Sequence, residues 1–191
     1  MSLNDDPRWR RLQDREITCA SCGKLHQGLF DLVAVRPDHW PAGLEHSSNS
    51  AAQSSKNFLS EDFCVLNGEY FFVRCVLFVP IIGGDGQHLG YGSWSTLSQQ
   101  NFESYMDTFD DGEQDKLGPW FGWFSNRLHG YPDTLNLKCQ VQPQPKRQRP
   151  IITLEPTDHP LAREQRDGIT LDRLLEIYAV NGHDMRAALT D

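Results

Sequence analysis

The sequence predicts an α+β fold: a mostly antiparallel sheet of about five strands, helices packed on one face, and an N-terminal Cys-x-x-Cys knuckle. Two strand-like segments, 63–66 and 70–79, flank Asn67-Gly68, a pair that supplies the positive φ angles of a type I′ turn. Three amphipathic segments farther along the chain follow residues that suit helix starts. Strands joined by tight turns imply an antiparallel or mostly antiparallel sheet.

The remaining strands follow from turns and alternation. Gly83-Gly84-Asp85-Gly86 forms a second turn and leads to a short strand near 89–94. In residues 135–141, apolar and polar side chains alternate, which is the period of a strand with one buried and one wet face. Prolines at 143 and 145 end this strand, and 151–155 is expected to return beside it.

Helices are expected after Ser98, over 160–166 and after Thr170, with one further turn over 184–189. Ser98 and Thr170 can accept hydrogen bonds from the free N–H groups of a first helical turn, and apolar side chains follow both at helical spacing. Pro160 fits the first turn of the short helix between them.

The length of 191 residues is typical of one domain. Residues 1–16 read as a charged arm in which arginines balance acidic residues, and 17–182 as the α+β domain with its knuckle at 19–26. The polar stretch 42–56 has no apolar periodicity, so we expect a flexible insertion there. Residues 183–191 remain as a C-terminal tail.

Composition argues against several classes of partner and location. The longest apolar run, 70–82, contains Arg74 and Pro80 and is too short to span a membrane. With a net charge of −8 and one basic cluster, at 146–149, we expect no nucleic-acid binding. The first sixteen residues lack the apolar stretch of a signal peptide, and five cysteines with one Cys-x-x-Cys pair suit a reducing compartment. We therefore expect a cytoplasmic protein without membrane contact.

The strongest chemical signal is the segment Thr18-Cys-Ala-Ser-Cys-Gly-Lys-Leu-His26. The thiolates of Cys19 and Cys22 can converge on one tetrahedral zinc ion, and His26 lies within reach as a third ligand. No second Cys-x-x-Cys completes the site. Cys64 is the best fourth candidate because it starts a strand, ahead of His39 and His46. The sequence thus predicts a structural zinc site at Cys19, Cys22, His26 and Cys64.

Two other interpretations of the cysteine pair remain open. Cys19 and Cys22 can form a dithiol redox pair, although such a motif normally follows a strand and opens a helix, which the glycine-containing residues 23–28 do not suggest. They can also be ordinary thiols that bind nothing. Cys75 and Cys139 fall within strand patterns and are expected to be small buried side chains.

Two further segments contain side chains that are candidates for binding or catalysis. Residues 118–124 place four large aromatic side chains between glycines, either lining a ligand groove or partner surface or folding under the sheet to close the core. Around the start of the helix at 160–166, the residues Glu155, Asp158, His159 and Glu164 can form a carboxylate–histidine site for metal or acid–base chemistry. The alternative is that they cap the helix and pair with Arg163 or Arg166.

Five segments of the chain, in consistent order between about 17 and 178, resemble the bacterial domain-of-unknown-function family 2199. They are Cys19-Ala-Ser-Cys-Gly-Lys-Leu-His26, Leu59-Ser-Glu-Asp-Phe-Cys64 with Tyr70-Phe-Phe-Val-Arg74, Gly122-Trp-Phe-Ser-Asn-Arg-Leu128, Tyr131-Pro-Asp-Thr-Leu-Asn-Leu-Lys138 and Arg149-Pro-Ile-Ile-Thr-Leu-Glu-Pro-Thr-Asp-His-Pro-Leu-Ala162. The resemblance implies a bacterial cytoplasmic protein and brings no established activity. Cys75 departs from it, since glycine is expected there.

Two functional hypotheses follow from these patterns. The first is a non-catalytic binding or regulatory module with a structural zinc knuckle, whose partner is a protein or a small molecule. The second is a small metal-dependent or acid–base enzyme using His159 and the neighbouring carboxylates. Convergence of those groups on an open cavity favours the enzyme, whereas their use in caps and ion pairs favours the binding module.

Overall fold

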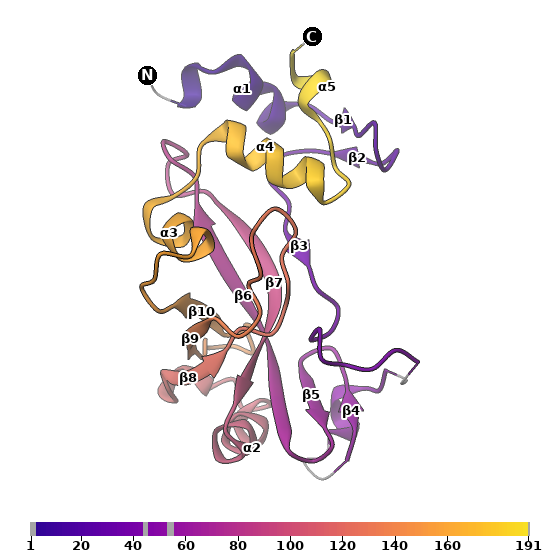
Figure 1. Cartoon of the computed structure of the whole chain (residues 1–191), viewed down its shortest axis with the longest axis vertical. Coiled ribbons are helices and arrows are strands. Elements are labelled where there is room, and N and C mark those ends of the chain that lie inside the picture. Colours follow the sequence, from indigo (N-terminus) through magenta and orange to yellow (C-terminus); the bar gives the residue numbers. More distant parts are fainter. Residues whose placement is uncertain (1–2, 44–45, 53–55, 191) are drawn as a thin grey trace.

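The computed structural model describes residues 3–43, 46–52 and 56–190, and it has the expected α+β class (Figure 1). A two-stranded sheet pairs β1 (Ile17–Thr18) with β2 (Leu25–His26), and an eight-stranded sheet forms the body of the molecule. The strands of the larger sheet are β3 (Leu32–Val33), β4 (Phe58–Leu59), β5 (Phe63–Leu66), β6 (Tyr70–Pro80), β7 (His88–Leu97), β8 (Trp120–Trp123), β9 (Lys138–Gln142) and β10 (Ile151–Leu154). The helices are α1 (Pro7–Asp14), α2 (Gln99–Thr108), α3 (Pro160–Asp167), α4 (Leu171–Val180) and α5 (Arg186–Thr190), with short 3-10 turns at Leu3–Asp5, Asn49–Ala51 and Gln114–Lys116.

The expectation of a mostly antiparallel sheet of about five strands is wrong. The sheet has eight strands in mixed pairing, with the order β3-β7-β6-β10-β9-β8 and with β5 and β4 attached beside β6. Two pairings are parallel: β10 lies along β6, and β3 lies along β7. In the sequence, β10 follows β7, β8 and β9. It therefore pairs with the free edge of β6 without a tight turn between these two strands. The tight turns at 67–68 and 83–86 therefore predicted only their own two hairpins.

Local signals around these hairpins and helices are confirmed. Asn67 and Gly68 both have positive φ, and they connect β5 to β6. The hydroxyls of Ser98 and Thr170 accept the amide hydrogens of Asn101 and Arg173, and so cap α2 and α4.

Strand β6 separates the two faces of the sheet. Its odd-numbered residues from Phe71 to Val79 belong to the main core, which also holds every buried apolar side chain of the helices. On the other face, Phe72 packs with Trp94 of β7 and with Trp40 in a smaller cluster that contains no helical residue. The helices therefore cover one face of β6 and leave the other to strands and loops.

The sheet curls until its last strand, β8, meets β7 again. The Trp123 amide donates to Thr96 Oγ1 at 2.9 Å, the Ser125 amide donates to the Trp94 carbonyl at 2.8 Å, and Ser95 forms a bridge with Phe124. Strands β7, β6, β10, β9 and β8 thus form a nearly closed ring. Its closure requires glycine at 122, because an added Cβ would collide with the Ser95 hydroxyl and would lie 2.5 Å from the Thr96 carbonyl oxygen.

The expected arm (1–16), domain (17–182) and tail (183–191) stay predictions, and the structure places a helix, α1 or α5, in each of the two end segments. Helix α1 buries Trp9 and Leu12 in the main core, and α5 buries Leu189 there. The Arg11 guanidinium donates to the Leu189 carbonyl at 2.7 Å, which joins the two helices. The apolar residues of α1 are spaced three apart, so arginines can dominate its composition while one narrow stripe stays buried.

The flexibility expected for 42–56 stays a prediction, and residues 44–45 and 53–55 within it lie outside the described residues. Among residues 3–43, 46–52 and 56–190, no helix is long and apolar enough to cross a membrane.

Replacing Gly122 by alanine should destabilise the protein by about 1–3 kcal/mol, because the methyl group must displace backbone of β7. Gly92→Ala is the matched control: it also lies in a strand, but its Cβ would meet Val33 Cγ2 at an ordinary 3.4 Å. Urea unfolding of both variants measures the difference. Equal stability of the two variants would contradict the ring closure.

Candidate metal centre

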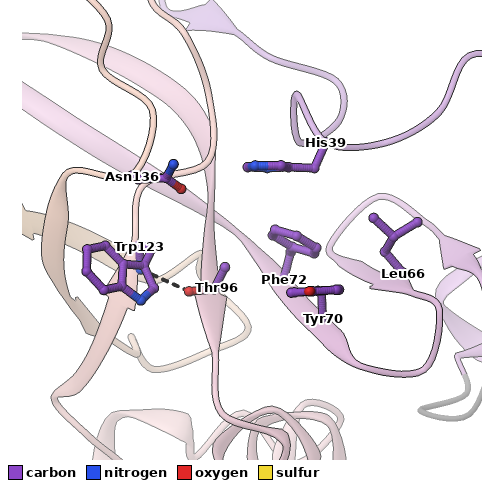
Figure 2. Close-up of a pocket in the computed structure, with 7 residues that line it drawn as sticks. All are labelled: His39, Leu66, Tyr70, Phe72, Thr96, Trp123 and Asn136. Atoms are coloured by element: carbon purple, nitrogen blue, oxygen red, sulfur yellow. Dashed lines mark hydrogen bonds between the residues drawn. The ribbon is translucent and has the colours of Figure 1, made fainter.

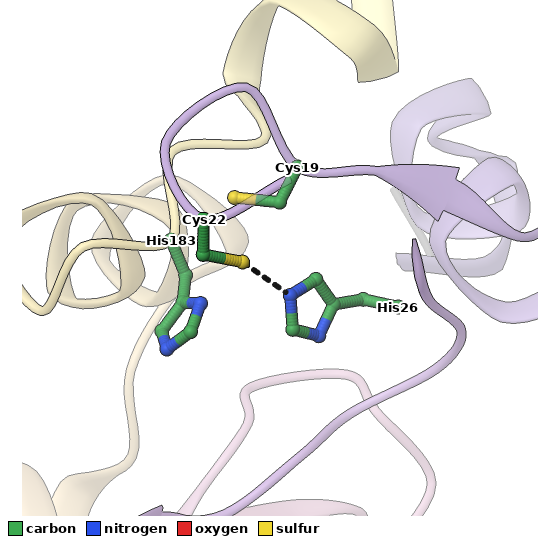
Figure 3. A group of neighbouring side chains, drawn as sticks. All are labelled: Cys19, Cys22, His26 and His183. Atoms are coloured by element: carbon green, nitrogen blue, oxygen red, sulfur yellow. Dashed lines mark hydrogen bonds between the residues drawn. The ribbon is translucent and has the colours of Figure 1, made fainter. Parts of the chain in front are cut away.

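The knuckle is a tight turn between the two short strands β1 and β2. The Cys19 amide donates to the Lys24 carbonyl and the Gly23 amide donates to the Cys19 carbonyl, both at 2.9 Å. Gly23 has a φ of 69°, which glycine adopts without strain. This turn brings Cys19, Cys22 and His26 to one side of the hairpin (Figure 3).

A fourth group comes from the C-terminal segment: His183. One ligand atom from each of Cys19, Cys22, His26 and His183 lies within 4.8 Å of the other three. Within the cluster, Cys22 Sγ and His26 Nε2 are 3.3 Å apart (Figure 3). In a tetrahedral zinc site with these donors, ligand atoms are about 3.3–3.8 Å apart, so a small contraction of the group would accommodate the ion.

Helix α4 and the turn after it position His183. The His183 amide donates to the Tyr178 carbonyl at 2.8 Å, and Gly182 before it has a φ of 82°. Directly after His183, the Asp184 amide donates to the Ser21 hydroxyl at 3.3 Å. The C-terminal segment is therefore hydrogen-bonded to the knuckle itself.

Aromatic stacking connects the ligand cluster to the core. The His26 ring stacks on Phe30 with centroids 4.4 Å apart, and Phe30 stacks on Tyr178 at 4.2 Å. The Tyr178 hydroxyl donates to the Phe30 carbonyl at 2.9 Å and accepts from the Phe30 amide at 3.1 Å. Because His183 also meets Phe30 edge-on at 5.1 Å, both histidine rings are held by one aromatic side chain.

Local electrostatics favour the protonation states that bind metal. Burial alone would raise the pKa of Cys19, but hydrogen bonds to its sulfur from Cys22 and Ser21, through their backbone amides first, lower it on balance. Burial, followed by the positive charges of His183 and Lys24, lowers the pKa of His26. A thiolate and a neutral imidazole are the forms that ligate a metal ion.

The structure brings together Cys19, Cys22 and His26, three of the four residues predicted as ligands, and places His183 rather than Cys64 beside them. Cys64 is the second residue of β5, and that strand lies at the opposite end of the molecule from β1 and β2 (Figure 1). Its side chain packs with Phe72 and Trp94, and burial raises the pKa of its thiol. His39 lies on that same far face, stacked on Phe72, and His46 is exposed.

His183 carries no signal that sequence reasoning could have used. It lies far from the cysteines along the chain, with no second ligand at a regular spacing beside it. Only the packing of α4 against Phe30 brings it to the knuckle.

The other cysteines are buried, as expected for Cys75 and Cys139. Both lie in the main core with no exposed surface. Burial, the largest effect, raises the pKa of Cys139 to about 11, although Ser95 at 3.3 Å from its sulfur counteracts this. These thiols are thus poor nucleophiles and poor ligands.

The acidic segment near α3 is largely engaged in structural contacts. His159 is the N-cap of α3, and its Nδ1 accepts the Leu161 amide hydrogen at 3.1 Å. Glu164 accepts from the Tyr131 hydroxyl at 2.5 Å and pairs with Arg173 at 2.9 Å. The helix capping expected as the alternative to catalysis is thus observed for His159, whereas Glu164 pairs with Arg173 and not with the expected Arg163 or Arg166.

The aromatic segment 118–124 forms β8 and divides its side chains between two faces. Trp120 packs against the main core and Phe124 is buried in it, whereas Phe121 and Trp123 remain 48% and 39% exposed. The core-closing interpretation is thus confirmed for Trp120 and Phe124, whereas a ligand or partner on the outward face of Phe121 and Trp123 stays a prediction.

A family model described as an uncharacterized protein conserved in bacteria (DUF2199) matches residues 18–169. The chain belongs to this family. The DUF2199 match includes Cys19, Cys22 and His26, while His183 lies beyond the matched residues. Comparisons with curated proteins and with solved structures found no match.

If His159 is a capping residue, His159→Ala should lower the free energy of unfolding by about 0.5–2 kcal/mol. His159→Asn should retain most of the stability, because asparagine is a good N-cap. Urea unfolding compares the two variants. Equal losses in the two variants would contradict the capping role of the His159 side chain.

Proposed function

We propose that this protein is a binding or regulatory module whose N-terminal and C-terminal segments are joined by a structural zinc ion. The observation that carries the proposal is the group of two thiols and two imidazoles, contributed by the knuckle, β2 and the turn after α4, with ligand atoms within 4.8 Å of one another.

The donor set supports zinc over other biological metals. Thiolate sulfur and imidazole nitrogen in a two-plus-two combination are typical of tetrahedral zinc, whereas magnesium and calcium prefer oxygen ligands. No carboxylate belongs to the cluster among the residues that the structure describes.

A structural role fits better than a catalytic one. Four protein ligands complete a tetrahedral coordination and leave no position for substrate or water. The surrounding structure supports this role, because β1 and β2 have two residues each and bury little apolar surface of their own. A hairpin of this size needs a crosslink to remain ordered.

The enzyme hypothesis has weaker support, since His159 and Glu164 already serve as cap and ion-pair partner. The dithiol hypothesis explains Cys19 and Cys22 but gives no role to His183, whereas the zinc hypothesis requires all four residues.

Protein purified without a metal-affinity tag should contain about one zinc ion per chain by elemental analysis. Cys19→Ser, Cys22→Ser and His183→Ala should each lose most of it, because a three-ligand site binds the ion much more weakly. Cys64→Ser is the matched control and should retain the metal, since this cysteine is also buried but lies outside the cluster.

His183→Ala separates the zinc and redox hypotheses. Loss of zinc in this variant supports the four-ligand site. Full zinc content in His183→Ala would exclude His183 as a ligand, and metal-free wild-type protein with a reversible Cys19–Cys22 disulfide would establish the redox pair instead.

Removing zinc with a chelator should loosen the two ends of the chain together. Amide hydrogens in 17–26 and 183–190 should exchange faster, because the knuckle and α5 lose their common anchor, while β6 and β7 should keep their protection. Hydrogen exchange followed by mass spectrometry measures this. Uniform acceleration over the whole chain, or none at either end, would contradict a local structural role.

A further inference from the structure

A second candidate site lies on the sheet face that the helices leave open. A cavity of about 310 Å³ opens there, within the size range of ligand pockets. We define it as the aromatic slot, lined by His39, Tyr70, Phe72, Trp123 and Asn136, with Leu66 and Thr96 completing it. None of these residues belongs to the metal cluster.

The slot has two opposed sides. Figure 2 shows the rings of His39, Phe72 and Tyr70 on one side and Trp123 with Asn136 on the other, with Thr96 between them. Phe72 is 2% exposed, and its ring lies 25° from the plane of His39 with centroids 6.1 Å apart. Flat side chains on both sides of a cavity favour a flat ligand that can stack.

Trp123 is fixed in place by its neighbours. Its backbone amide donates to Thr96 Oγ1 at 2.9 Å, and its ring meets Phe121 edge-on at 5.1 Å. The ring is nevertheless 39% exposed. A large aromatic side chain held rigidly yet left open to solvent is a binding surface with a low entropic cost.

Asn136 adds hydrogen-bonding capacity. Its φ of 62° suits asparagine, and its backbone amide donates to the Phe124 carbonyl at 2.8 Å, so the backbone explains the residue type in part. Its side-chain amide makes no hydrogen bond within the described part of the chain. An asparagine amide offers one donor and one acceptor side by side, a pair that matches the N6 and N7 positions of adenine.

Charge around the slot selects among flat ligands. No carboxylate lines the slot, and Lys138 places its Nζ 5.9 Å from the centre of the Trp123 ring. A quaternary ammonium ligand, the other usual occupant of aromatic cages, would be repelled by this lysine. An uncharged ring that carries an anionic substituent would be attracted.

We propose that the aromatic slot binds a purine mononucleotide, with the base between the aromatic walls, its Hoogsteen edge on Asn136 and its phosphate near Lys138. The inference rests on the binding role proposed above, but it is independent of the metal. The inference assigns the proposed binding role to one cavity and to one class of ligand.

The test measures adenosine monophosphate binding by titration calorimetry and by Trp fluorescence, using full-length protein with its metal content determined. Saturable binding is expected. Trp123→Ala and Asn136→Gly should each weaken it at least about tenfold. Glycine at 136 keeps the positive φ and removes only the amide, and Ile82→Ala is the control for an exposed apolar side chain outside the slot.

Three further ligands identify which part of the nucleotide the protein recognises. Lys138→Gln should weaken adenosine monophosphate binding but leave adenosine binding unchanged. Ribose 5-phosphate should not bind, and cytidine monophosphate should bind more weakly than the purine nucleotide.

Absence of binding, or equal affinity in wild type, Trp123→Ala and Asn136→Gly, would overturn the slot proposal. Equal binding of ribose 5-phosphate would also overturn it, because a phosphate site alone would then explain the data. Circular dichroism verifies that each variant is folded. If the nucleotide does not bind while zinc is still bound, the slot proposal fails and the zinc proposal stands. If chelated protein still binds the nucleotide, nucleotide binding does not depend on the metal.

Discussion

Strands β6 and β7 pair without interruption from Phe71 opposite Leu97 to Pro80 opposite His88, and the rest of the fold is built on this pair. Strands β5 and β10 attach to β6, β3 attaches to β7, and the remaining strands of the sheet follow through their neighbours. Because strand side chains alternate, the same pairing also sets two faces: one receives the helices, and the other, which includes Phe72, faces the aromatic slot. One hairpin thus determines where apolar surface is buried and where it stays open.

The hairpin of β1 and β2 depends on a different interaction from the one that stabilises the large sheet. The two-residue strands β1 and β2 gain little from backbone pairing, and the knuckle contributes only Ile17 and Cys19 to the buried apolar side chains. The hydrophobic effect therefore gives the β1–β2 hairpin little stability, although α1 and α5 bury Trp9, Leu12 and Leu189 in the main core. The zinc ion that we propose would add its binding free energy directly to folding. The Phe30–Tyr178 stack supplies the rigid support that orients both histidines before any ion binds.

Sequence patterns predicted the elements whose signals are local. Asn67-Gly68, Ser98 and Thr170 act through backbone groups within a few residues, and all three occur where expected. The incorrect predictions of the sheet have two physical causes. A two-residue strand shows no measurable periodicity, and the parallel pairing of β10 with β6 depends on contacts far apart in the chain. The metal cluster shows the same division. Cys19, Cys22 and His26 share one turn and were predictable, whereas His183 reaches them only through tertiary packing.

The two candidate sites lie toward opposite ends of the β6–β7 pair. The knuckle and α5 lie beyond one end of these strands in Figure 1, whereas the slot residues Tyr70 and Thr96 belong to the other end, near the β5–β6 turn and the start of α2. Between them the pair is buried on the helix side along its whole length. A continuous, well-packed sheet of this kind transmits little local disorder, because opening it requires loss of the whole core. We therefore expect the proposed metal binding and the proposed nucleotide binding to act as separate equilibria.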